Sequence, residues 1–139
     1  MTTDGLLLDT CFVLWLSANE PVARSAVEEV TRVRKVGGVI AISAISAWEI
    51  GLLVAKGRLP YIKSALSWFE RFVEEGKVEV ARVDVELFVE SSFLPGDVHG
   101  DPADRIIIAT ARAKNLAIVT RDRPILAYSA AGYVKAVRC

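Results

Sequence analysis

The sequence alternates short apolar runs with longer segments of helical periodicity, and this alternation limits the fold more than any other feature. The apolar runs are rich in leucine and β-branched residues and predict strands at residues 6–8, 39–42, 78–81, 116–120 and 133–137. The other segments have apolar residues at helical spacing and predict helices at residues 21–35, 44–56, 61–75, 85–93, 102–114 and 124–130. Strands that alternate with helices form parallel sheets with helices on both faces. We therefore expect an α/β fold with a parallel sheet of about five strands and right-handed crossovers.

Length, charge and cysteine content limit the class of protein. A chain of 139 residues can bury one proper core but not two, so we expect one domain over residues 1–139. The 17 basic and 17 acidic residues balance, so any contact with nucleic acid must be local. Cys11 and Cys139 form neither a disulfide framework nor a metal-binding spacing. We find no signal peptide or membrane span and expect a soluble cytoplasmic protein.

Four acidic residues fall where strands end or where the following helices begin. Asp9 ends the first apolar run, and Asp122 follows the strand at 116–120 by two residues. Glu49 lies one to two turns into a helix that follows a strand, and Asp104 lies in the first turn of another helix. In an open parallel sheet, ligands bind beyond the carboxyl ends of the strands. Carboxylates gathered at that edge predict a hard-metal site, and they suggest metal-dependent phosphodiester chemistry.

Helix capping offers a structural explanation for several of these acids. Asp101 followed by a proline fits an N-cap and a first helical position, and Asp104 then occupies the acidic position of a capping box. Ser46 and Glu49 have the same capping-box spacing, and Asp122 can cap the helix that begins near residue 124. Capping explains Asp101 best, Glu49 and Asp122 less well, and Asp104 less well again.

Asp9 is the acid that capping explains least. It interrupts the apolar sequence LLLDTCFVLWL, and a buried carboxylate costs several kcal/mol unless it is paired or neutralised. A cation is a natural partner. Four neighbouring anions without a cation would repel, so at least one pKa should rise and divalent ions should stabilise the fold.

Four segments together resemble the PIN-domain nucleases, and specifically the VapC toxins of type II toxin–antitoxin systems. They are LLLDTCFVLWL, ISAISAWEIGLLVAKGRL, LPGDVHGDPADRIIIATA and LAIVTRDRPILAY, and the resemblance runs nearly end to end. The acidic residues of the family pattern correspond here to Asp9, Glu49, Asp104 and Asp122. The resemblance implies a three-layer α/β/α PIN-like fold.

The resemblance also implies an activity and its partners. Such proteins use Mg²⁺ or Mn²⁺ to hydrolyse RNA, act as toxins held inactive by a cognate VapB-like antitoxin, and commonly form homodimers. We expect Asp9 and Asp104 to ligate metal directly. Glu49 and Asp122 would ligate through water or assist the attacking water.

Residues beside the acids are candidates for contact with the substrate. Arg121 and Arg123 flank Asp122 and are candidate contacts to the RNA backbone. Thr120 can hydrogen-bond a carboxylate or the attacking water, although a β-branched strand residue needs no such role. His99 is the chain's only histidine; a loop contact or cap suits it better than catalysis.

The middle of the chain contains apolar residues that suit either a core or a partner surface. One predicted helical face faces the core and comprises Ile62, Ala65, Leu66, Phe69, Phe72 and Val73. Three further residues can contribute to a groove for the antitoxin: Trp48, Leu52 and Trp68.

Three other classes of protein remain as alternatives. A non-catalytic PIN-type module that binds RNA or a partner is disfavoured by the intact set of acids. A phosphoryl-receiver domain usually has paired acids near its first strand and a lysine after a late strand, whereas Asp9 has no acidic neighbour there and Arg121 follows Thr120. A nucleotide-cofactor enzyme lacks support because no glycine-rich loop follows the first strand.

Overall fold

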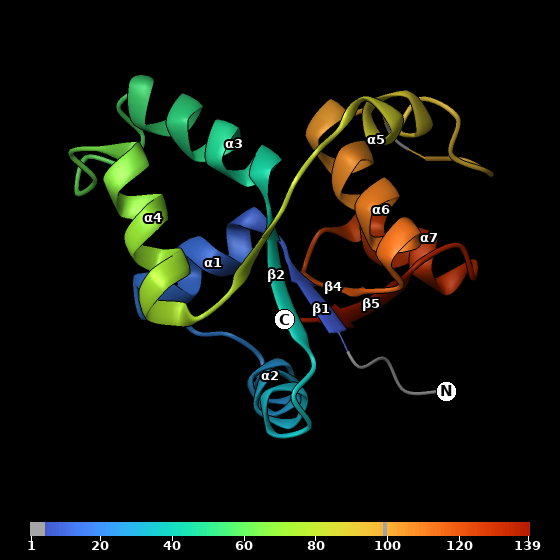
Figure 1. Cartoon of the computed structure of the whole chain (residues 1–139), viewed down its shortest axis with the longest axis horizontal. Helices are drawn as coiled ribbons and strands as arrows, with labels where there is room; N and C mark the ends of the chain where they lie inside the picture. Colours follow the sequence, from blue (N-terminus) through green and yellow to red (C-terminus); the bar gives the residue numbers. More distant parts are fainter. Residues whose placement is uncertain (1–4, 99) are drawn as a thin grey trace.

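The computed structural model describes residues 5–98 and 100–139, in which five strands form one parallel sheet in the order β3-β2-β1-β4-β5 (Figure 1). The strands are β1 (Gly5–Leu8), β2 (Val39–Ser43), β3 (Glu79–Ala81), β4 (Ala117–Thr120) and β5 (Lys135–Arg138). All five predicted strands are present to within two residues at each end, and the predicted parallel α/β class is confirmed. His99 lies outside the described residues.

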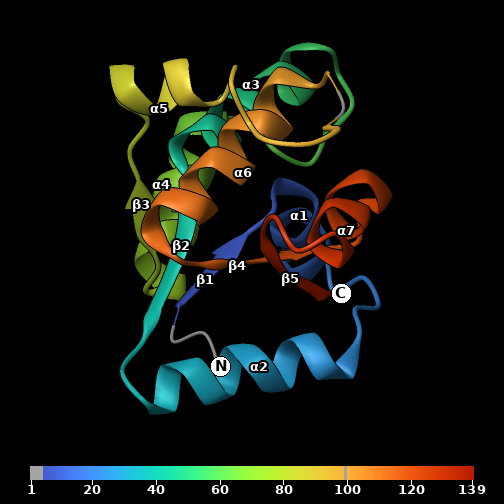
Figure 2. The same cartoon turned by 90° about the vertical axis from the view of Figure 1, so that its right-hand side faces the viewer.

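Helices cover both faces of the sheet (Figures 1 and 2). They are α1 (Thr10–Ser17), α2 (Arg24–Lys35), α3 (Ala44–Ala55), α4 (Ala65–Gly76), α5 (Val85–Glu90), α6 (Pro102–Lys114) and α7 (Arg123–Ala130). Because alternate side chains of a strand point to opposite faces, Leu6 and Leu8 of β1 belong to a core that includes side chains of α1 to α4. Leu7 packs with α6 and α7 on the other face. None of these helices, within the residues that the structure describes, is long and apolar enough to span a membrane.

The strand order places a topological switch between β1 and β4. From the central strand β1, the chain builds β2 and β3 outward on one side, and then crosses back to add β4 and β5 on the other. Connections that leave two neighbouring parallel strands in opposite directions open a crevice at the carboxyl ends of those strands. Asp9 follows β1 directly, and Asp122 follows β4 by two residues. The fold therefore brings together two acids that are far apart in the sequence.

Helix α1 was not predicted, and it is the main correction to the expected elements. Residues 10–17 are almost entirely apolar, so they lack the polar face that helical periodicity requires. The helix begins directly after Asp9, whose side chain accepts from the backbone N–H of Thr10. The apolar run is thus a short strand followed at once by a buried helix.

The predicted helix at 61–75 begins later and buries fewer residues than expected. It starts at Ala65, after Ser64 caps it by accepting from the backbone N–H of Ser67. Phe69 is buried as predicted, but Leu66 is 69% exposed and does not belong to the core.

Candidate active site

Asp9 is buried at the carboxyl end of β1, with both carboxylate oxygens accepting hydrogen bonds. Oδ1 accepts from the backbone N–H of Thr10 at 2.9 Å, and Oδ2 accepts from the hydroxyl of Thr120 at 2.7 Å. Burial raises the pKa of Asp9, and these two hydrogen bonds oppose the rise. The expected hydrogen bond from Thr120 to a carboxylate is confirmed. Thr120 is fully buried, and its hydroxyl positions Asp9. A contact of Thr120 with the substrate stays a prediction.

Glu49 projects from α3 and is tied to α1 through a chain of hydroxyls. The hydroxyl of Thr10 donates to Glu49 Oε1 at 2.6 Å and lies 2.7 Å from the hydroxyl of Ser46. Since the single proton of Thr10 goes to Glu49, Ser46 must donate to Thr10. Burial raises the pKa of Glu49, against the hydrogen bond from Thr10. Sequence reasoning missed Thr10, whose only signal is its place directly after Asp9.

The predicted capping box of Ser46 and Glu49 is wrong. The N-cap of α3 is Ser43, whose hydroxyl accepts from the backbone N–H of Ile45 at 3.1 Å. Ser46 lies inside the helix and is fully buried. The strand β2 runs directly into α3, so the cap comes three residues earlier than the spacing suggested. Glu49 therefore has no capping role.

Asp101 caps α6 and leaves Asp104 to face the other acids. The Oδ1 atom of Asp101 accepts from the backbone N–H of Asp104 at 3.0 Å, and Pro102 begins the helix, as predicted. Desolvation, followed by the charges of Asp101, Asp9, Asp122 and Glu49, raises the pKa of Asp104 to about 8. The expectation that at least one carboxyl pKa is raised is confirmed.

Asp122 completes the set and caps α7. Its Oδ2 accepts from the backbone N–H of Ile125 at 3.0 Å, so the predicted cap is confirmed. Its own backbone N–H donates to the hydroxyl of Thr120 at 3.0 Å. Thr120 thus links Asp9 and Asp122 through one oxygen atom. Capping uses one oxygen of Asp122 and is compatible with a further role for the other.

The acids line one pocket of about 860 Å³ at the switch point of the sheet. Its walls come from the starts of α1, α6 and α7 and from one face of α3, and they include Asp9, Glu49, Asp101, Asp104 and Asp122. Desolvation and the charges of four of these acids raise the pKa of the Cys11 thiol in the same pocket to about 11. The pocket is therefore strongly negative where a cation would bind.

Protein groups already hold Asp9, Glu49, Asp101 and Asp122 through hydrogen bonds to their carboxylates. Across residues 5–98 and 100–139, no three acidic, histidine or cysteine side chains converge tightly enough to hold one ion. This spread follows from mutual repulsion and from the hydrogen bonds that hold Asp9, Glu49 and Asp122. The donors are all carboxylate oxygens, the ligand type that Mg²⁺ and Mn²⁺ prefer, so the residues present fit a hard cation.

Three basic residues line the carboxylate pocket, and one of them, Arg121, also makes structural contacts. The guanidinium of Arg121 lies 3.8 Å from the ring centroid of Trp15 and donates to the carbonyls of Pro21 and Cys139 at 3.1 Å. These contacts give Arg121 a structural role that its sequence position did not reveal. Arg123 and Lys56 also line the pocket and are exposed.

The comparisons with known proteins agree with this geometry. A family model described as "PIN domain" matches residues 6–130. Ribonuclease VapC22 of Mycobacterium tuberculosis is 33% identical over 128 residues, which cover 88% of this chain and 89% of that protein. The chain belongs to the PIN-domain family. Within the family it is a VapC-type protein.

Solved structures share this PIN fold at low sequence identity. The VapBC2 structure from Rickettsia felis, bound to a promoter DNA fragment, aligns with a TM-score of 0.69 and 19% identity over 96% of this chain and 98% of that one. A DNA-bound VapBC structure from Salmonella typhimurium aligns with a TM-score of 0.65 and 19% identity, covering 96% and 97%. These matches establish the fold, and the expected PIN-like architecture is confirmed.

The raised pKa of Asp104 makes the metal-free PIN domain lose stability as pH rises. Between about pH 4 and pH 8 the unfolded chain ionises Asp104 while the folded chain retains the proton, so unfolding is favoured progressively over that range. We expect Asp104→Asn in EDTA to raise the Tm at pH 8 by on the order of 5 °C, with the difference vanishing near pH 4. Thermal melts of Asp97→Asn, an exposed acid outside the pocket, provide the control. Parallel pH profiles for wild type and Asp104→Asn would contradict this account.

Removing the hydroxyl of Thr120 tests its hold on Asp9. Thr120→Val keeps the shape of the side chain but leaves Asp9 Oδ2 without this buried donor, so we expect a loss of about 1–3 kcal/mol in the free energy of unfolding. Urea denaturation at pH 7 measures it. The matched control is Thr31→Val, because the hydroxyl of Thr31 bonds only locally, to the carbonyl of Val27 on the exposed surface of α2. Equal losses in both variants would show that the hydrogen bond to Asp9 contributes nothing.

Proposed function

We propose that this VapC-type protein is a metal-dependent endoribonuclease in which Asp9, Glu49, Asp104 and Asp122 form the catalytic, metal-binding set. The observation that supports this assignment most is that carboxylates from four separate segments line one negative pocket at the switch point of the sheet. The pKa of Asp104, raised to about 8, adds support, because groupings of like charges that destabilise the folded chain are typical of functional sites.

The four acids divide into two pairs by their attachment. Asp9 and Asp104 are the direct ligands in this proposal. Both oxygens of Asp9 are held by hydrogen bonds. The pKa of Asp104 is raised to about 8, so a neighbouring positive charge would favour its ionised form. Glu49 and Asp122 are each held at one carboxylate oxygen, by Thr10 and by the start of α7. In this proposal Glu49 and Asp122 ligate the ion through water or assist the attacking water.

The residues of the pocket support phosphodiester hydrolysis as follows. When bound, Mg²⁺ or Mn²⁺ supplies an activated water and neutralises charge that develops on the scissile phosphate. Glu49, with a raised pKa, is the residue suited to accept a proton from that water at its carboxylate. Arg123 and Lys56, exposed at the rim, bind neighbouring phosphates of the RNA. Arg121 also lines this pocket and packs over the ring of Trp15, and its contact with the substrate stays a prediction.

We propose further that the protein is the toxin of a toxin–antitoxin pair in the cytoplasm, held inactive by a VapB-like antitoxin. The fold neighbours include DNA-bound VapBC structures and a member of the VapBC family of toxin–antitoxin systems from Mycobacterium tuberculosis, which supports this partner. Trp48 and Leu52, two of the three residues predicted for a partner groove, are exposed and line the carboxylate pocket. Trp68 stacks on Phe72 against the core and does not line this pocket.

The homodimer stays a prediction. Exposed apolar side chains on α5 and just after it are the surface that best suits a second copy: Val85, Phe88, Val89 and Phe93. A catalytically inert PIN module is the remaining alternative, and the complete acidic set argues against it. Membership of the PIN-domain family rules out the phosphoryl-receiver alternative.

RNA cleavage tests the proposed activity directly. Purified protein incubated with total RNA and Mn²⁺ should produce defined fragments, and either EDTA or Asp9→Asn should reduce the rate at least a hundredfold, since the first removes the cation and the second its buried ligand. Glu79→Gln, which removes an exposed acid at the opposite end of the sheet, should cleave like wild type. Cleavage that survives both EDTA and Asp9→Asn would overturn the proposal.

Metal binding should also be visible as stability. A divalent cation at a hundred times its Kd should add about 2.7 kcal/mol to the free energy of unfolding, because it binds only the folded site. Thermal melts with Mg²⁺ and with Mn²⁺ should show a higher Tm for wild type and Glu79→Gln, and little change for Asp9→Asn. The ion that gives the larger shift at equal concentration is the tighter ligand. An unchanged Tm in wild type would contradict the assigned site.

A further inference from the structure

Although the net charge of the chain is zero, basic and acidic residues are unevenly distributed along the sequence. Residues 105–139 contain seven lysine or arginine residues and a single acid, Asp122. Residues 1–104 contain ten basic and sixteen acidic residues. The basic segment comprises most of α6, then β4, α7 and β5, which the fold gathers on one side of the molecule (Figures 1 and 2). A local basic surface therefore exists beside the acidic pocket.

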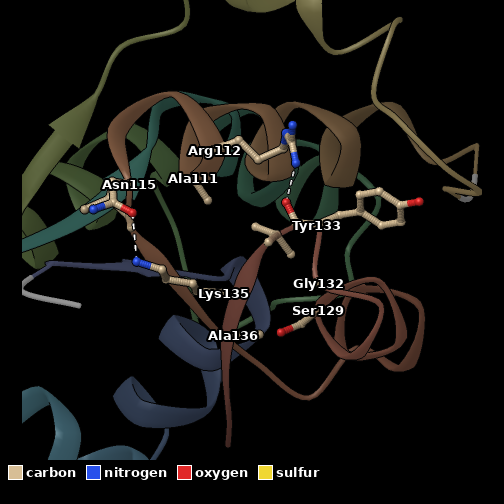
Figure 3. Close-up of a pocket in the computed structure, with 10 residues that line it drawn as sticks. Ala111, Arg112, Asn115, Ser129, Gly132, Tyr133, Lys135 and Ala136 are labelled. Carbon is tan, nitrogen blue, oxygen red and sulfur yellow. Dashed lines mark hydrogen bonds between the residues drawn. The ribbon is translucent and has the colours of Figure 1, made fainter. Parts of the chain in front are cut away.

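A second pocket, of about 630 Å³, lies within this basic region (Figure 3). It is formed by the end of α6, the end of α7 and the start of β5. Lys135 and Asn115 stand on one side of it and Arg112 on the other, with Ser129 across from them (Figure 3). Among the described residues that line it, none is acidic.

Both cations of this pocket are held in place without losing their capacity to donate. Lys135 Nζ donates to Asn115 Oδ1 at 2.9 Å, and Arg112 Nη1 donates to the carbonyl of Tyr133. An ammonium group has three N–H donors and a guanidinium has five, so each retains donors for an anion. Neither cation has a carboxylate among these partners. Their positions are thus set in advance for a ligand rich in oxygen and negative charge, such as a phosphate.

Helix α7 connects this pocket to the carboxylates. Its N-terminal cap, Asp122, lies in the carboxylate pocket, and Ser129, near its C-terminus, lines the basic one. Eight helical residues span about 12 Å, so the two pockets lie a few nucleotides apart along α7. The helix contains no acid after its cap, and it begins with Arg123.

The other side of α6 offers a poorer path for a polyanion. There Arg112 and Lys114 border a pocket that also contains Asp84, Glu86 and Glu90. Those acids would repel a phosphate, whereas the path over α7 and β5 meets none. Of these two paths, the charge distribution therefore favours the one over α7 and β5.

We propose that the pocket of Arg112 and Lys135 binds a backbone phosphate of the RNA, a few nucleotides from the scissile bond, and so orients the strand along α7. This inference rests on the proposed ribonuclease function. A phosphate contact of this kind contributes affinity and register but carries no base specificity. It predicts that longer RNA binds more tightly than RNA that fills only the carboxylate pocket.

The test compares RNA binding by two variants made in an Asp9→Asn background in EDTA, so that no cleavage occurs. One variant adds Arg112→Gln and Lys135→Gln. The other adds Lys35→Gln and Lys63→Gln, two exposed lysines elsewhere on the surface, and has the same net charge. Fluorescence anisotropy with labelled single-stranded RNA of about three and about twelve nucleotides measures Kd at several salt concentrations.

The proposal expects a selective loss with the longer RNA. Arg112→Gln with Lys135→Gln should weaken binding of the twelve-nucleotide RNA roughly threefold to tenfold and lower the slope of log Kd against log salt by about 0.7 to 1.4. The three-nucleotide RNA and the control variant should be unaffected. Lys135→Gln alone should show about half of the change in slope, which guards against a folding defect caused by losing the contact of Arg112 with Tyr133.

Two outcomes would overturn the proposal, and they differ from failure of the proposed function. If wild type cleaves RNA but both double variants bind alike, the pocket has no role and the ribonuclease assignment stands. If the Asp9→Asn protein binds neither RNA and wild type does not cleave, both proposals fail together. In the kinetics of active protein, Arg112→Gln with Lys135→Gln should raise KM for long RNA and leave kcat unchanged.

Discussion

The burial of one carboxylate, Asp9, at the end of the central strand is the constraint on which the site depends. A charge removed from water needs compensation, and here it comes from the amide of Thr10 and the hydroxyl of Thr120. Those two hydrogen bonds fix where α1 leaves the sheet and how β1 and β4 end. The other acids are then arranged around a point that Asp9 defines. The compensation is incomplete, because the pKa of Asp9 remains raised, and a hard cation would supply the rest.

The strands, the parallel sheet and the four acids were predictable because each depends on a local pattern. Apolar runs predict strands, and an acid that follows such a run falls at the carboxyl edge whatever the strand order. Helix α1 escaped prediction because its exposed side includes apolar residues such as Leu16, so it has no clear polar face. The capping box at Ser46 failed because spacing alone does not reveal that β2 runs directly into α3. The role of Arg121 depends on Trp15 and Cys139, which only the fold brings near it.

The arrangement of charge reconciles a neutral chain with a polyanionic substrate. The carboxylates repel RNA unless a cation neutralises them, so the substrate needs attraction from elsewhere on the surface. The basic segment from residue 105 onward supplies it on the side of α6 and α7, while the acids of α5 lie apart from the path along α7. The surface that attracts RNA and the pocket that would cleave it are thus adjacent but separate. The free protein in this view holds its substrate loosely and becomes productive only when metal is present.

The shared hydroxyl of Thr120 has a consequence for how this chain can vary in evolution. One oxygen atom donates to Asp9 and accepts from the backbone of Asp122, so two segments separated by more than a hundred positions are mechanically joined. Loss of this hydroxyl would disturb Asp9 and the start of α7 together, so substitutions at positions 9 and 120 will not be additive. A single substitution that removes the hydroxyl at position 120 therefore loses two hydrogen bonds, although the residue is fully buried. Serine, which keeps the hydroxyl, is the replacement with the lowest cost.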